Sequence, residues 1–359
     1  MIESIEFKNF KALRDTKLPL APCTIIVGPN GSGKSTVLQA LEACRDPVRF
    51  LMAQPSVGGM VGFVQPGMGI IQPQAGFRRL ANFGIRDIND ARVSVRLNWS
   101  DFPPATAFER YWTSNGPGGG VVAPGGIDQT KRTAMEKAVD RIRIFSLDAN
   151  RIAGISPVQG SAELATDGSG LAAVLDGMRD EAPEQFKAIE IRIGEWLPEF
   201  DRILFDRPQQ GVKSVALRTR DGQYKVPASD LSQGTLIALA LLTLAYHPTP
   251  PSLIALEEPD RGVHPYLLRY IRDTLYRLSH PDSAGENREP VQVIATTHSP
   301  YFLDLFRESP GEIVVANKVG LDVQFQRLTD EPHFQDILGE AALGEAWFSG
   351  VLGGVPSRS

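Results

Sequence analysis

The 359-residue sequence predicts an α/β fold, with a mixed, mostly parallel sheet and helices on both faces. Two apolar segments, Thr24–Val27 and Ser252–Leu256, have the composition of strands that are covered on both sides. Helical and strand patterns alternate through the second half of the chain, which is typical of a parallel sheet. A glycine-rich loop joins the first of these strands to the helix Lys34–Arg45.

Four parts are expected, and the first is residues 1–52 of the core. Met1–Phe7 alternates apolar and charged residues, which predicts a strand. It does not resemble a signal peptide, because no basic start precedes a long apolar run. The strand Thr24–Val27 and the helix Lys34–Arg45 follow, and the apolar residues of the helix share one face.

Residues 53–150 are predicted to form an inserted antiparallel and helical lobe. Arg92–Trp99 and Ala107–Thr113 alternate like exposed strands. Two tracts rich in glycine and proline, residues 53–80 and Asn115–Gly126, are expected to be flexible loops.

Residues 151–230 are predicted to form a lobe of helices and strands that leads to the next motif. Leu171–Trp196 has helical periodicity with a break at Pro183. Ser214–Val226 is predicted to be two strands joined by a turn at Asp221-Gly222.

Residues 231–359 are predicted to complete the core with two helices and two buried strands. Its first helix, Leu231–Tyr246, holds the longest apolar stretch of the chain, which is too short to span a bilayer. The strand Ser252–Leu256, the helix Pro265–Leu278 and the strand Val291–Thr296 follow.

Composition and charge are those of an ordinary globular protein. The net charge of −5 gives no global basic field of the kind that attracts nucleic acid. The two cysteines, Cys23 and Cys44, cannot form a disulfide framework, so a reducing cytoplasm is the expected location.

A phosphate-binding loop is the most specific motif in the chain. It matches the P-loop pattern G-x-x-x-x-G-K-[ST], which arises by chance in roughly one percent of chains of this length. Backbone N–H groups of such a loop, and the positive end of the helix after it, bind phosphate. Lys34 is expected to reach the β- and γ-phosphates of ATP, and Ser35 to ligate Mg²⁺. The predicted loop residues are Gly28, Pro29, Asn30, Gly31, Ser32, Gly33, Lys34, Ser35 and Thr36.

Two carboxylates follow the apolar strand that ends at Leu256. A buried parallel strand delivers such groups to the carboxyl edge of the sheet, beside the P-loop. Glu257 is expected to hold Mg²⁺, directly or through water, and Glu258 to polarise the water that attacks the γ-phosphate. The alternative is a strand that ends in solvated acids.

Two further positions have both a structural and a functional interpretation. Ser232, Gln233 and Gly234 open the long apolar helix, where Ser232 is also a natural N-cap. His298 follows the strand Val291–Thr296, although a lone histidine is most often structural.

The order of these motifs resembles that of the ABC-type ATPases. In that family a signature serine and glycine bind the γ-phosphate of a nucleotide held by the other protomer, and a switch histidine bonds the same phosphate. The resemblance implies that Ser232, Gln233 and Gly234 bind nucleotide in this way and that His298 contacts the γ-phosphate. It also implies a P-loop NTPase fold.

The surrounding residues are similar to the SMC, RecF and OLD branch of that family. Ile5–Lys11 resembles the start of these proteins rather than of membrane transporters. Glu257–Asp260 and Gly262–Pro265 resemble the E-E-P-E…G-L-H-P block of OLD-like predicted ATPases, and Thr297–Pro300 their T-H-S-P. The tail, Leu343–Gly354, is similar to a family of small stand-alone ATPases of this branch.

Some features of related proteins are not found in the sequence. It has no zinc hook, no long coiled-coil arms and no segment long enough for a Toprim nuclease. Asp148 and Asp167 are isolated, so no cleavage of DNA or RNA is expected. Four glutamines compete for the Q-loop position: Gln54, Gln65, Gln72 and Gln74.

A set of basic residues between residues 78 and 143 has two interpretations. Together with Trp99 and Trp112 it would form a DNA-facing surface, or it would be a solvated face with interspersed acids. The set is Arg78, Arg79, Arg86, Arg92, Arg96, Lys131, Arg132, Lys137, Arg141 and Arg143.

We therefore expect an ABC-type ATPase that binds and hydrolyses ATP with Mg²⁺ and dimerises around two ATP molecules. The resemblance suggests a role in DNA transactions, DNA repair or defence against phage. The alternative is a regulatory switch that presents residues 53–150 to a separately encoded effector protein and does not bind DNA. A sensor that barely turns ATP over is disfavoured by Glu258.

Overall fold

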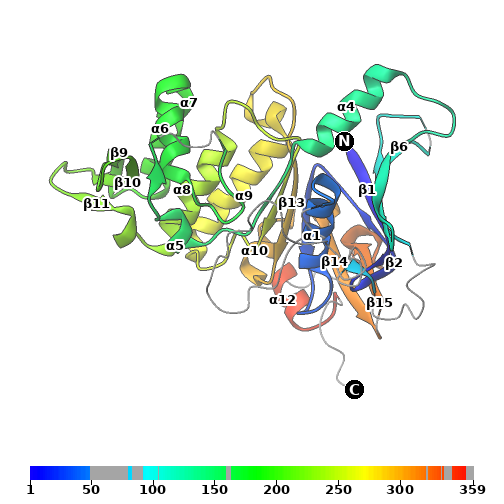
Figure 1. Ribbon diagram of the computed structural model, residues 1–359. Coiled ribbons are helices and arrows are strands. Elements are labelled where there is room, and N and C mark those ends of the chain that lie inside the picture. Colours follow the sequence, from blue (N-terminus) through cyan, green and yellow to red (C-terminus); the bar gives the residue numbers. More distant parts are fainter. Residues whose placement is uncertain are drawn as a thin grey trace.

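The central element of the fold is a six-stranded sheet of order β15-β14-β3-β13-β12-β7 (Figure 1). The computed structural model describes residues 1–48, 80–82, 92–103, 105–158, 163–320, 322–332, 334 and 342–352. Only the pair β14 and β15 is antiparallel among the described strands of this sheet, which confirms the prediction of a mixed, mostly parallel sheet. Its strands are β3 (Cys23–Val27), β7 (Ile142–Phe145), β12 (Leu253–Glu257), β13 (Gln292–Thr297), β14 (Ile313–Val319) and β15 (Asp322–Arg327).

Helices cover both faces of this sheet, as Figure 1 shows. Successive strand residues alternate between two buried clusters: Leu253 and Ala255 face α1, whereas Ile254 and Leu256 face α8 and α9. This alternation explains why the strands are apolar at every position. The covering helices are α1 (Lys34–Arg45), α8 (Gln233–Ala245) and α9 (Pro265–Ser279).

A second sheet is antiparallel and packs on the other side of α1. Its order is β2-β1-β4-β5-β6, so strands from residues 53–150 pair directly with the N-terminal strand. Residues 53–150 also supply β7 to the central sheet and α4 (Gln129–Asp140). Their behaviour as a separate lobe stays a prediction. The strands are β1 (Ile2–Phe10), β2 (Leu13–Pro19), β4 (Val93–Trp99), β5 (Ala107–Thr113) and β6 (Gly116–Val122).

One strand of this sheet comes from a tract predicted to be a flexible loop. The prediction for Asn115–Gly126 was wrong, because β6 pairs with β5 along its whole length. Its glycines permit a close approach of the two backbones: a Cβ on Gly119, where φ is +120°, would lie 2.1 Å from the carbonyl oxygen of Glu109. The ring of Tyr111 occupies the corresponding space at Gly118. The glycines therefore serve packing rather than flexibility.

The middle of the antiparallel sheet is buried against α1. Val93, Val95 and Leu97 of β4 are fully buried, so the prediction of an exposed strand was wrong there. Trp112 is fully buried as well, with its ring centroid 6.0 Å from that of Phe10. Tryptophans packed in this way are not available to stack on nucleic-acid bases.

Residues 149–227 form a group of short helices and a small antiparallel sheet beside α8. The predicted helix break at Pro183 and the predicted turn at Gly222, where φ is +73°, are both confirmed. The elements are α5 (Ala149–Ile152), β8 (Ser156–Pro157), α6 (Leu171–Glu181), α7 (Pro183–Trp196), β9 (Phe200–Asp206), β10 (Val212–Thr219) and β11 (Lys225–Pro227).

Both cysteines are buried, and neither forms a disulfide. Burial raises the pKa of the Cys44 thiol to about 12, so this side chain is a poor nucleophile and behaves as a small apolar residue.

A buried glutamate lies just before β14, at the amino end of the central sheet. Glu312 is 8% exposed, and its Oε1 lies 3.7 Å from Nε2 of His280. Its second oxygen has no hydrogen-bond partner among the described residues. Burial raises the pKa of this carboxyl to about 7, although the nearby Arg272 acts in the opposite direction.

We predict that Glu312→Gln stabilises the fold by an amount that grows as the pH rises from about 4.5 to about 7 and then stays constant. The folded protein holds the proton of Glu312 up to a pH of about 7, whereas the unfolded chain releases it near 4.5. Protonated Glu312 therefore makes its full contribution to the stability of the wild type below the pKa of the unfolded chain, 4.5. This contribution is lost as the pH rises through the folded-state pKa of about 7. Urea unfolding at pH 8 should give the variant about 1–3 kcal/mol more stability, and the gain should vanish toward pH 4.5.

Glu308→Gln is the matched control, because Glu308 is exposed on the same connection. An equal gain for both variants, or a gain that persists at acidic pH, would contradict the assignment to burial of Glu312.

Candidate functional site

The P-loop connects β3 to α1 at the carboxyl edge of the central sheet. All five residues of β3 are buried, and Gly33 precedes α1 with φ at +85°. Lys34 folds back over the loop, and its Nζ donates to the carbonyl oxygens of Gly28 and Pro29, each at 2.9 Å. Burial lowers the pKa of Lys34 to about 8, while Glu258 and Glu257 act to raise it. The lysine therefore carries its charge at neutral pH.

The loop is tightly enclosed. A Cβ on Gly28 would lie 2.6 Å from the carbonyl oxygen of Ala316 in β14, so only glycine fits there. The hydroxyl of Ser32 is buried and has no hydrogen-bond partner in the described part of the chain. A phosphate oxygen would supply the missing partner, and this orphaned group fits the nucleotide that the motif predicts.

The two predicted magnesium ligands meet beside the loop. Ser35 in the first turn of α1 donates its hydroxyl proton to Oε1 of Glu257 at 2.5 Å. The residues are 222 positions apart in the sequence, so this contact comes entirely from the fold. Two hard oxygen donors at one point suit Mg²⁺.

Glu258 and His298, for which catalytic roles are predicted separately, lie close together. Glu258 lies one residue past β12 with φ at +44°, a conformation unusual for a non-glycine residue. Its backbone N–H donates to Thr296, to the carbonyl oxygen at 3.1 Å and to Oγ1 at 3.2 Å. Its Oε1 lies 3.6 Å from Nε2 of His298. Burial lowers the pKa of His298, and the charge of Lys34 lowers it further.

The predicted signature residues lie at the start of α8. Ser232 is the N-cap, and its Oγ accepts from the backbone N–H of Thr235 at 3.1 Å, as the structural interpretation of this residue predicted. Gly234 lies against the turn that follows β12. A Cβ on Gly234 would lie 3.6 Å from the carbonyl oxygen of Gly262. Their contribution to a nucleotide site stays a prediction.

Among the helices that the structure describes, none has the length and apolar character of a membrane span.

A cavity of about 720 Å³ opens beside the turn formed by Ser232, Gln233 and Gly234, which we call the signature turn. Polar groups from three segments line it, including Asn150, Ser229, Gln233 and Arg261. The signature turn is therefore accessible from outside the chain.

Three residues near the catalytic pair received no role from the sequence. Thr297 donates through Oγ1 to Oδ2 of Asp260 at 2.9 Å, which ties the two loops together. Gly344 belongs to the tail helix α12 (Leu343–Phe348), and a Cβ there would lie 2.4 Å from the carbonyl oxygen of Pro300. Thr297 and Gly344 belong to segments that resemble motifs of related ATPases. A motif, however, does not show which distant residues its members contact.

Other predicted positions lie outside the described residues or are engaged elsewhere. Arg92 forms an ion pair with Glu109 and stacks over Tyr111, and Arg96 donates to the carbonyl oxygen of Ala105. These contacts favour the solvated-face interpretation of the basic set. The predicted residues outside the described part are Gln54, Gln65, Gln72, Gln74, Arg78, Arg79, Arg86, Gly353 and Gly354.

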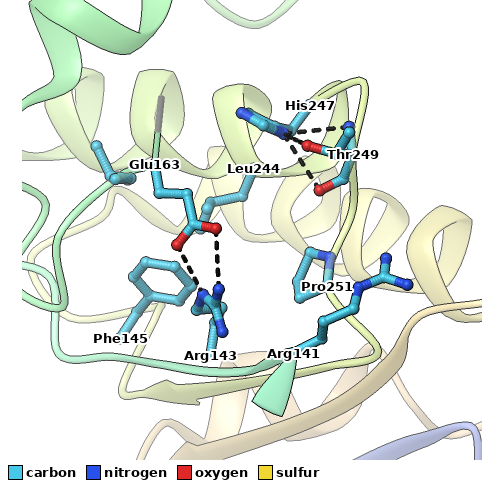
Figure 2. Close-up of a pocket in the computed structure, with 9 residues that line it drawn as sticks. Arg141, Arg143, Phe145, Glu163, Leu244, His247, Thr249 and Pro251 are labelled. Carbon is cyan, nitrogen blue, oxygen red and sulfur yellow. Dashed lines mark hydrogen bonds and ion pairs between the residues drawn. The ribbon is translucent and has the colours of Figure 1, made fainter. Parts of the chain in front are cut away.

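Two more arginines of the basic set line a pocket of about 280 Å³ (Figure 2). Arg143 pairs with Glu163 through two contacts of 2.9 and 3.0 Å, and Arg141 donates to the carbonyl oxygen of Pro250. Phe145 and Leu244 provide apolar walls. The pocket lies along β7, the outer strand of the central sheet, from Arg141 to Phe145. Arg143 and Glu163 neutralise each other within the chain.

No group of three or more His, Cys, Asp or Glu that could hold a metal ion occurs among the described residues. The sequence predicted that Asp148 and Asp167 are isolated, but they are neighbours in the fold. The backbone N–H of Asp148 donates to the carbonyl oxygen of Asp167 at 3.0 Å. Each carboxylate, however, accepts from a local backbone N–H, at Arg151 and Ser169 respectively.

Two family models match the chain. Residues 137–304 match the family described as "AAA domain, putative AbiEii toxin, Type IV TA system", and residues 1–49 match "AAA ATPase domain". The first match includes the signature turn, the acidic strand and the histidine, and the second includes the P-loop.

Known proteins resemble the chain in sequence and in fold. An OLD nuclease of Thermus scotoductus is 25% identical over 343 residues, and the match covers 86% of this chain and 60% of the relative. An SMC head bound to the C-winged helix domain of ScpA shares the fold with a TM-score of 0.58 at 15% identity, covering 90% of this chain and 97% of that one.

A second SMC head, bound to the C-terminal domain of ScpA and derived from Pyrococcus furiosus, has a TM-score of 0.55 at 16% identity. That comparison covers 94% of this chain and 98% of the SMC head. The chain thus has a P-loop NTPase fold like that of SMC heads, matches AAA ATPase domain models over two segments, and is similar in sequence to an OLD nuclease of which it spans about 60%.

Proposed function

We propose that the protein binds and hydrolyses ATP at the edge of the central sheet. The observation that carries the proposal is the contact between Ser35 and Glu257, next to the pair of Glu258 and His298. These four residues come from three separate segments, and together with Lys34 beside Ser35 they include every predicted metal and catalytic position. A structural role alone would not require them to converge.

Each residue then has a defined task. The loop N–H groups and Lys34 bind the phosphates, and the lysine exchanges its bonds to Gly28 and Pro29 for bonds to the β- and γ-phosphates. Ser35 and Glu257 would hold Mg²⁺, which would supply positive charge to neutralise the phosphate oxygens. Glu258 orients the attacking water and accepts its proton. His298 donates to the γ-phosphate.

ATP would also join two copies of the chain. In the proposed dimer, Ser232, Gln233 and Gly234 of one protomer bind the γ-phosphate held by Lys34 of its partner. The exposed signature turn and the cavity beside it support this arrangement. An N-cap serine can serve a phosphate with the same hydroxyl and helix end.

The ATP cycle would act in DNA transactions, DNA repair or defence against phage. The support is the sequence similarity to an OLD nuclease. The second candidate is a switch for a separate effector protein, and the two SMC heads with bound ScpA domains favour it. A gel shift at several salt concentrations, with and without ATP, distinguishes the two. ATP-dependent retardation that weakens with salt supports DNA binding, and its absence supports the effector.

We predict that Lys34→Ala lowers ATP turnover by on the order of 100-fold or more, because the variant loses a positive charge that stabilises the transition state. Phosphate release in the presence of Mg²⁺ measures this. Lys131→Ala on the exposed face of α4 is the matched control and should keep full activity. Full turnover in both variants would exclude the P-loop as the site.

We predict that Glu258→Gln forms a stable dimer with Mg-ATP. The amide keeps the size of the side chain but does not accept a proton from water, so binding survives while hydrolysis stalls. ATP then favours the dimer by mass action. Light scattering at micromolar protein measures it, and a monomer at saturating Mg-ATP would contradict the prediction.

The mixed dimer of Lys34→Ala and Gly234→Asp adds a test of trans contacts. One of its two sites loses both elements, and the other keeps both. Mixing two inactive variants should therefore restore part of the activity if one intact site can act alone.

A further inference from the structure

A buried hydrogen bond joins the two loops that carry the catalytic pair. Asp260 lies two residues past Glu258, and Thr297 lies directly before His298. Thr297 is fully buried, and its Oγ1 donates to Oδ2 of Asp260 at 2.9 Å. The two side chains therefore link the loop after β12 to the loop after β13.

The Thr297 hydroxyl takes part in a second hydrogen bond, in which it is the acceptor. The backbone N–H of Ser299 donates to Oγ1 of Thr297 at 3.0 Å. The threonine oxygen is the acceptor there, so its single proton is available for Asp260. Thr297 and Ser299 flank His298, and one hydroxyl therefore holds the backbone on both sides of the histidine. An acceptor at position 260 keeps this hydroxyl in place.

The loop that carries Glu258 is held from the same strand. The backbone N–H of Glu258 is bonded to Thr296, and the N–H of Arg261 donates to the carbonyl oxygen of Glu258 at 3.0 Å. Adjacent threonines of β13 thus fix the two loops: Thr296 fixes Glu258 directly, and Thr297 does so through Asp260. The separation of 3.6 Å between Glu258 and His298 depends on both connections.

The other oxygen of Asp260 has no role in holding the fold. Its Oδ1 is buried and has no hydrogen-bond partner among the described residues. A buried and unpaired carboxylate oxygen is destabilising, and such groups are rare without a functional reason.

We propose that Asp260 is a positioning residue, which through Thr297 sets the distance and orientation between Glu258 and His298. This inference rests on the proposed function, in which these two side chains act together on the water and the γ-phosphate. Asp260 itself contacts neither.

Asp260→Ala, which removes the acceptor, and Thr297→Val, which removes the donor, test the proposal by steady-state kinetics. Each variant should lower kcat by between about 10- and 100-fold, with KM for ATP unchanged, because small misplacements of catalytic groups have effects of this size. Thr297→Ser keeps the hydroxyl and should restore kcat. The double variant should be no slower than the slower single variant, since both changes remove one connection. Asp282→Ala is the exposed control.

The imidazole NMR signal of His298 provides a readout that needs no turnover. The chain has five histidines, and His298→Gln assigns the signal. At one fixed pH and without nucleotide, the signal should shift in Asp260→Ala and in Thr297→Val and return in Thr297→Ser. Thermal unfolding of each variant shows whether it is folded.

Two results would overturn the positioning role. The first is wild-type kcat and an unshifted His298 signal in Asp260→Ala. The second is equal loss in Thr297→Ser and Thr297→Val, which would indicate packing. A wild type that shows no Lys34-dependent turnover would instead contradict the proposed function, and the NMR signal would still test the positioning.

Discussion

The parallel pairing of β12, β13 and β3 is the constraint on which the whole site depends. Glu257 lies opposite Thr296 across the β12–β13 ladder, and Thr297 lies opposite Val27 across the next one. Parallel strands end at the same edge, so the acidic loop, the histidine loop and the P-loop emerge together. A register change of one residue in β12 would carry Glu257 away from Ser35 and would turn its side chain to the opposite face.

Apolar patterning alone does not fix this register. Both faces of the sheet are buried, and a shifted strand would still present apolar side chains to both cores. Polar contacts at the strand ends discriminate between registers, because they form in one alignment only. The bonds from Glu258 to Thr296 and from Thr297 to Asp260 are such contacts. The same residues therefore specify the sheet and shape the site.

The electrostatics of this edge depend on a few charges at close range. Glu257 and Glu258 lie near the buried Lys34, and burial together with the charge of Glu258 raises the pKa of Asp260 to about 6. ATP would add further negative charge. Binding at this edge would therefore rely on Mg²⁺ and on the helix and loop N–H groups as well as on Lys34.

Features encoded by contiguous residues were predictable from the sequence. The P-loop, the apolar strands, the helix break at Pro183 and the cap at Ser232 each depend on local dihedral preferences or on a fixed pattern of neighbours. The order of the motifs along the chain then identified the fold class. It also placed Glu257 and Glu258 at the correct edge of the sheet.

Tertiary structure alone decided the features that depend on contacts between distant segments. Strand β6 formed from a glycine tract because its backbone packs closely on β5, and the two tryptophans became core residues because α1 covers their sheet. The link from Asp260 to Thr297 is invisible in either segment by itself. Local sequence sets the conformation of each segment, whereas the pairing of groups far apart along the chain is set by how the segments pack.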